Sequence, residues 1–111
     1  MEIERLHKML LDAGIEHDWC DRTPPGYNKW HERYPDWLGE KKNWGWQIRM
    51  YSPNRKQVIS AIEGFGSCCY DADLIEIMGL LTPEEKEYSR VVGWLTAEDV
   101  FERIVRAVND A

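Results

Sequence analysis

Aromatic rings interleaved with cations between residues 27 and 55 are the side chains best suited to chemistry. Flat rings stack on nucleobases for about 1 to 3 kcal/mol per base, and Lys and Arg neutralise phosphates. This pattern predicts a site for a nucleotide-like molecule, with ordinary packing of the rings as the alternative. The rings predicted to stack are Trp30, Tyr34, Trp37, Trp44 and Trp46, and the cations predicted to hold the anion are Lys42, Arg49 and Arg55.

A glycine-rich turn over residues 64–67, Gly-Phe-Gly-Ser, adds a second ligand-binding candidate. Backbone N–H groups in such a turn can face a phosphate, and the Ser67 hydroxyl adds one more polar group. The segment is too short for a P-loop and lacks its lysine. A plain turn is the alternative, because glycine is the usual turn residue.

The three cysteines offer a different chemistry. Cys20, Cys68 and Cys69 are odd in number and two are adjacent, so reduced thiols are expected. Cys68 or Cys69 with His17 or His31 would make a nucleophile and base, and a small buried apolar side chain is the alternative. Neither a Cys-x-x-Cys nor a His-x-x-x-His spacing occurs, so we expect no metal and no cofactor.

Charge is distributed unevenly along the chain, whose net charge is −6. Residues 71–111 carry ten acidic and four basic side chains, whereas residues 21–56 have a local surplus of four positive charges. A duplex-DNA binder is usually more basic, so direct duplex binding is not expected. The acidic half suggests mimicry of a nucleic-acid backbone in the basic channel of a nuclease, with solvated helix faces as the alternative.

Length and composition predict one folded domain over residues 1–111, with 43% apolar and 31% charged residues. The first residues lack a signal-peptide layout, and no apolar run approaches the roughly 18 residues of a membrane span. We therefore expect a chain that remains in the cytoplasm and does not interact with membranes.

The elements that must position these residues follow from hydrophobic periodicity and from helix caps. We expect a two-layer α+β sandwich, with amino- and carboxy-terminal helices packed on a mostly antiparallel sheet of three or four strands. Residues 21–43 form an aromatic, basic connecting segment that contains a short helix. The expected elements are helices over residues 3–13, 27–34, 82–89 and 96–108, a strand over 15–20, a hairpin over 44–62 that turns at 53–54, a strand over 74–78 and an extended segment over 91–95.

Three stretches of the second half carry a resemblance: residues 64–67, residues 73–82 (DLIEIMGLLT) and residues 93–104 (GWLTAEDVFERI). They resemble small uncharacterised phage and prophage proteins of clostridia and their relatives. The resemblance implies a phage setting and no assigned activity or catalytic residues. Members often have tyrosine or glycine where this chain has Cys68 and Cys69, and residues 21–43 resemble an extension of a shorter link.

The combined prediction is a non-enzymatic anti-defence protein that sequesters a nucleotide-derived immune signalling molecule without cleaving it. The alternatives are an inhibitor that binds a host defence nuclease through an acidic surface, and a cysteine-dependent hydrolase. The partner is thus a nucleotide-like small molecule or a host defence protein. A homodimer is a further expectation, with Trp94 and Phe65 as candidate contacts.

Overall fold

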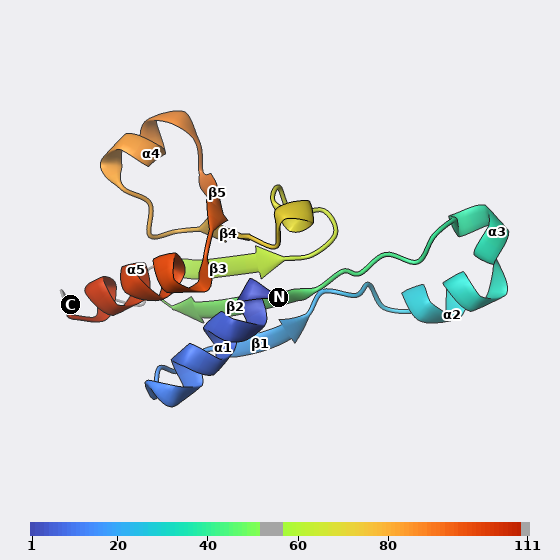
Figure 1. The fold of residues 1–111 in the computed structure, drawn as a ribbon, viewed down its shortest axis with the longest axis horizontal. Coiled ribbons are helices and arrows are strands. Elements are labelled where there is room, and N and C mark those ends of the chain that lie inside the picture. The colour runs from blue at the N-terminus through green and yellow to red at the C-terminus, as the bar shows by residue number, and fades with distance from the viewer. Residues whose placement is uncertain (52–56, 110–111) are drawn as a thin grey trace.

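A computed structural model of the chain describes residues 1–51 and 57–109. The chain combines short strands with helices of unequal length (Figure 1). Its elements are α1 (Glu2–Asp12), β1 (Asp18–Asp21), α2 (Tyr27–Arg33), α3 (Pro35–Leu38), β2 (Trp46–Tyr51), β3 (Val58–Glu63), β4 (Ile75–Met78), α4 (Pro83–Tyr88), β5 (Val91–Leu95) and α5 (Ala97–Asn109).

The strands form one antiparallel sheet in the order β1-β2-β3-β4-β5. This confirms the predicted α+β class, with five strands in place of three or four because β1 pairs with β2 and β5 pairs with β4. The predicted hairpin is confirmed as β2 and β3, whose register runs from Trp46↔Glu63 to Tyr51↔Val58. The turn expected at Pro53 and Asn54 lies outside the described residues.

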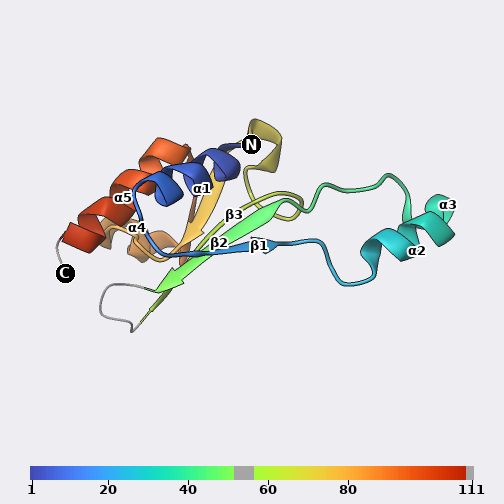
Figure 2. The same cartoon turned by 90° about the horizontal axis from the view of Figure 1, so that it is seen from below.

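Helices α1 and α5 lie side by side on one face of the sheet (Figures 1 and 2). Side chains alternate between the faces of a strand, so every second residue of β2, β3 and β4 faces these helices. The core between helices and sheet is mainly apolar, with Glu63 as a buried charged residue at its edge, and burial of this apolar surface is the main stabilising contribution to the fold. It includes Ile3, Leu6, Leu10, Ile48, Ala61, Ile75, Ile77, Val100 and Ile104.

The predicted starts of α4 and α5 are confirmed. Thr82 and Glu85 form a capping box, and Thr96 and Asp99 exchange the same pair of hydrogen bonds before α5. Glu85 also accepts two hydrogen bonds from Arg103 on α5, at 2.8 and 2.9 Å. This ion pair, with the Thr82 amide, lowers the pKa of Glu85 to about 2 and fastens α4 to α5.

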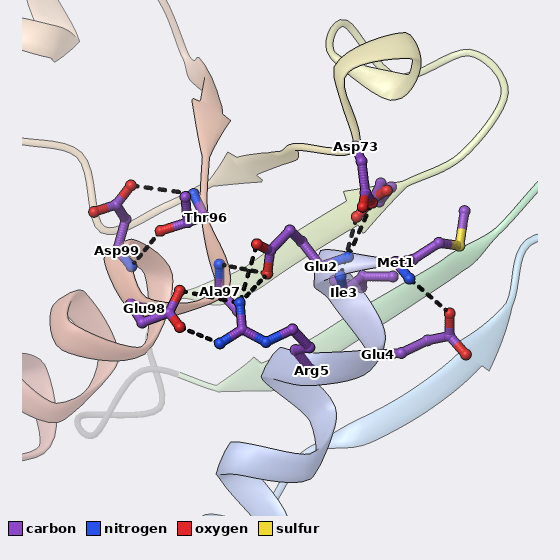
Figure 3. Close-up of polar contacts among 11 residues, drawn as sticks. Met1, Glu2, Ile3, Glu4, Arg5, Asp73, Thr96, Ala97, Glu98 and Asp99 are labelled. Carbon is purple, nitrogen blue, oxygen red and sulfur yellow. Dashed lines mark hydrogen bonds and ion pairs between the residues drawn. The ribbon is translucent and has the colours of Figure 1, made fainter.

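The first turn of α1 is capped by carboxylates from distant parts of the chain. The Glu2 amide donates to Asp73 Oδ1 at 3.0 Å (Figure 3). The Ile3 amide donates to Glu63 Oε1, also at 3.0 Å. Glu63 is 1% exposed. Burial and the hydrogen bond with Asp73 raise the pKa of Glu63 to about 7, while the same bond lowers the pKa of Asp73. The two carboxyl groups are therefore coupled, with Glu63 favouring its protonated form and Asp73 its ionised form.

A pH-dependent stability follows from Glu63. Its pKa is raised from 4.5 to about 7 in the folded state, so the stabilising effect of protonation is complete below pH 4.5 and is lost as the pH rises through 7. Asp73 stays ionised in both states across this window. We expect the free energy of unfolding to fall by about 2 kcal/mol between pH 5 and pH 8.

Chemical denaturation at several pH values checks this expectation. In Glu63→Gln, the amide mimics the protonated carboxyl, so the decline should disappear, whereas the exposed control Glu87→Gln should keep it. A wild-type stability that does not change between pH 5 and pH 8, or a Glu63→Gln variant with the same decline, would contradict the raised pKa of Glu63.

Residues 22–45, here called the arm, leave the sheet between β1 and β2 and project away from it (Figure 1). The arm carries α2 and α3, and the predicted short helix is confirmed as α2. Tyr34 precedes Pro35 and is non-helical, which separates the two helices, and Gly39 at φ +74° ends α3. The radius of gyration of 15.5 Å exceeds the roughly 13 Å of a compact chain of this length.

None of the helices formed by the described residues has both the length and the apolar character needed to cross a bilayer.

Candidate functional site

The arm is joined to the sheet by a network of backbone contacts at its root. The Arg22 guanidinium donates to the carbonyl oxygens of Trp44 at 2.7 Å and Phe65 at 3.1 Å. The Arg22 amide donates to Gly45 O, and the Phe65 amide donates to Asn43 O at 2.8 Å. Burial lowers the pKa of Arg22, opposed by the charge of Glu76. These bonds hold the two ends of the arm, at Arg22 and at residues 43–45, against the loop that follows β3.

Two glycines allow the close approach at this root. A Cβ atom on Gly45 would lie 1.9 Å from Glu63 O, and a Cβ on Gly64 would lie 2.0 Å from Trp44 O. Both residues also have positive φ, +70° and +144°. The root is therefore built on backbone-to-backbone contact that other residue types would prevent.

A cleft of about 420 Å³ opens between residues 40–43, where the arm returns toward the sheet, and the loop after β3. This volume falls within the usual range for small-molecule sites, roughly 300 to 1,000 Å³. We call it the arm-root cleft. It is lined by Glu40, Lys41, Lys42, Asn43, Phe65, Gly66, Ser67, Cys68, Tyr70 and Asp71.

The chemistry of the arm-root cleft is mixed. Lys42 Nζ lies 5.4 Å from the centroid of the Phe65 ring, which places a cation beside a flat apolar surface. Within residues 1–51 and 57–109, neither Lys41 nor Lys42 forms an ion pair. Unpaired ammonium groups attract phosphate, a ring stacks on a base, and carboxylates such as Asp71 accept hydrogen bonds from sugar hydroxyls. Together these groups match the parts of a nucleotide.

The structure does not bring the predicted site residues into one place. Trp30, Tyr34 and Trp37 form a cluster at the tip of the arm, where the Trp30 and Tyr34 rings stack at 5.5 Å and Tyr34 meets Trp37 edge to face at 6.3 Å. Trp44 lies at the root, edge to face with Phe65 at 5.0 Å. Of the predicted residues, Lys42 and Ser67 line the arm-root cleft.

The remaining predicted residues lie on the sheet or beyond the described chain. Trp46 stacks on Trp19 at 4.6 Å and packs against the core, so it follows the packing alternative. Arg49 is exposed on the opposite face, paired in register with Asp18. Arg55 lies outside the described residues.

Ser67 takes part in the turn itself. Its hydroxyl donates to Gly64 O at 2.8 Å and accepts from the Gly64 amide at 3.3 Å. The segment is thus the plain turn given as the alternative, with one face toward the arm-root cleft. The Ser67 hydroxyl is thus engaged with the backbone of Gly64 within the turn.

The expectation of reduced thiols at Cys68 and Cys69 is wrong in this structure, which joins the two neighbours by a disulfide. Cys20 is free. The two histidines considered as bases are engaged elsewhere: His17 hydrogen-bonds His7 and Ile15 O, and His31 hydrogen-bonds Gly39 O. In the described part of the chain, no group of three His, Cys, Asp or Glu side chains is placed to hold a metal ion.

Sequence reasoning missed Lys41, Phe65 and Tyr70 as site residues. A signal for two of them was present in the predicted hairpin. The register Trp46↔Glu63, extended by a few residues, places the two lysines before Trp44 beside the turn that contains Phe65. Tyr70 follows in a 3-10 turn that begins directly after Cys69, and no spacing rule indicates it.

No protein-family model, curated protein or solved structure matches the chain.

Proposed function

We propose that the chain is a non-enzymatic binding protein that holds a nucleotide-derived molecule in the arm-root cleft. In the phage setting suggested by the resemblance, such a protein would sequester an immune signalling nucleotide in the cytoplasm of the host cell. The observation that carries the proposal is the placement of Lys42 beside the Phe65 ring, with Lys41 lining the same cleft of about 420 Å³.

The parts of a nucleotide have separate partners in the cleft. Lys41 and Lys42 supply charge for phosphates, and Phe65 and Tyr70 supply rings for a base. Asp71 and Asn43 offer acceptors for sugar hydroxyls or an exocyclic amine. A bare anion would use only the lysines and would be repelled by the carboxylates, so the composition favours a nucleotide over inorganic phosphate.

Binding without cleavage is supported by the state of the cysteine in the cleft. Cys68 lines the cleft, and its sulfur is bonded to Cys69, so it is not available as a thiolate. We therefore expect a bound nucleotide to be released chemically unchanged.

Calorimetric titration tests the proposal. Wild-type protein is titrated with AMP, ADP-ribose and cyclic dinucleotides, with inorganic pyrophosphate as the control anion. We expect one nucleotide class to bind at one molecule per chain, with pyrophosphate about tenfold weaker because it lacks a ring and a sugar. Equal binding of pyrophosphate would show that the cleft binds anions without recognising a base or a sugar. Absence of binding by every nucleotide would contradict the proposal.

A further inference from the structure

The disulfide between Cys68 and Cys69 joins neighbouring residues whose side chains lie in different surroundings. Cys68 is exposed and lines the arm-root cleft, whereas Cys69 is 1% exposed. Thiol–disulfide exchange begins when a thiolate attacks one sulfur of the bond, so access decides where the bond opens. A thiol in solution can reach Cys68 and is kept away from Cys69.

The buried sulfur is placed to leave as a thiolate. Attack at Cys68 breaks the S–S bond and moves its electron pair onto Cys69 Sγ. This atom accepts a hydrogen bond from the Trp94 amide at 3.0 Å, and a hydrogen bond to the charged form of a group stabilises that form. Burial acts in the opposite direction, because it disfavours a thiolate. The Trp94 amide offsets part of this effect at the sulfur that is shielded from water.

Opening the bond changes the position of Cys68. The Cys69 carbonyl oxygen accepts hydrogen bonds from the Ala72 and Leu74 amides, both at 3.2 Å, which fixes the buried end of the pair. Gly93 lies against both sulfurs, since a Cβ atom there would lie 2.1 Å from Cys68 Sγ and 2.4 Å from Cys69 Sγ. Sulfur atoms that are no longer bonded must move apart. The exposed Cys68 side chain therefore turns outward, which places a free thiol in the arm-root cleft.

We propose that Cys68 and Cys69 form a reversible redox site that small dithiols open by attack at Cys68. One thiolate of the dithiol bonds to Cys68 Sγ as Cys69 leaves, and its second thiol then displaces Cys68 and closes the dithiol into a cyclic disulfide. The protein gains two electrons and two protons, and the dithiol loses the same. Glutathione disulfide reverses the reaction and is converted to two molecules of glutathione. This activity is separate from nucleotide binding, and its test uses no nucleotide.

Thiol counting tests the site in the folded protein. Thiols are counted by alkylation after acid quenching and denaturation, and the untreated chain should show one, because Cys20 is free. Dithiothreitol without denaturant should raise the count to three with an unchanged circular dichroism spectrum, and glutathione disulfide should return it to one. The control Cys68→Ala/Cys69→Ala should show one thiol throughout. A disulfide that is reduced only when the protein unfolds, or that does not re-form, would overturn the proposal.

Trapping identifies the sulfur that is attacked. A Cys20→Ser variant, which removes the third thiol, is treated briefly with 2-mercaptoethanol, quenched with acid, alkylated and sequenced by tandem mass spectrometry. We expect the mixed disulfide mainly on Cys68 and the alkyl group on Cys69. In the folded, reduced protein, iodoacetamide should modify Cys68 before Cys69. A mixed disulfide mainly on Cys69, or equal alkylation rates for the two thiols, would contradict attack at an exposed Cys68 that turns into the cleft.

Discussion

Replacing Gly93 with alanine is expected to lower the free energy of unfolding by about 3 kcal/mol. A Cβ atom there would lie 2.1 Å from Cys68 Sγ and 2.4 Å from Cys69 Sγ, far inside van der Waals contact. Cys69 is buried, and its sulfur accepts a hydrogen bond from the Trp94 amide at 3.0 Å. Moving the disulfide aside would therefore overpack the site and break this bond.

A double-mutant cycle tests the physical reason. In a Cys68→Ala/Cys69→Ala background, both sulfur atoms are absent, and the same Gly93→Ala change should cost less than about 1 kcal/mol. Chemical denaturation of the four proteins gives the coupling energy. An equal loss of stability in both backgrounds would show that the alanine clashes with something other than the disulfide.

Reversing both cleft lysines is expected to weaken nucleotide binding by about 100-fold, which corresponds to roughly 2.7 kcal/mol. Each reversal removes a charged hydrogen bond to phosphate and adds repulsion. Lys41→Glu/Lys42→Glu should nevertheless unfold at the wild-type temperature, because among residues 1–51 and 57–109 neither lysine forms an ion pair.

The control variant in this comparison must change the net charge of the protein by the same amount as the cleft variant. Lys8→Glu/Lys29→Glu changes the total charge by the same amount at sites that do not line the arm-root cleft. Titration of both variants at low and moderate salt should show normal binding in the control and weak binding in the cleft variant. Equal weakening in both variants would mean that the field of the whole protein, and not the cleft, attracts the nucleotide.

Local signals in the sequence predicted most of the fold. The hairpin follows from alternation in Trp46–Tyr51 and from β-branched residues after it, and α4 follows from the Thr82 capping box. These features depend on residues close together in the chain. The fifth strand was not counted because Val91–Leu95 is short and was predicted only as an extended segment, and pairing with β4 is what stabilises it as a strand.

The candidate site was less predictable because it depends on contacts between distant residues. The spacing of Trp30, Tyr34 and Trp37 is the same for a helix packed on the sheet and for one held away from it. Periodicity therefore could not predict that these rings lie at the tip of the arm and not in the arm-root cleft. The Gly93 contact with Cys68 and Cys69 spans about 25 residues of chain and left no pattern in the sequence. Reduced thiols were expected for a different reason, because an odd number of cysteines with two adjacent rarely suits an ordinary disulfide framework.

The most direct test of nucleotide sequestration is recovery of the ligand. Purified wild-type protein is incubated with an extract that contains cyclic and ADP-ribose-type nucleotides, washed and heat-denatured, and the released molecules are identified by mass spectrometry. We expect one intact nucleotide per chain from the wild type and none from Lys41→Glu/Lys42→Glu. Release of no nucleotide by the wild type, or of a cleaved product, would contradict a binding protein that sequesters its ligand in the arm-root cleft.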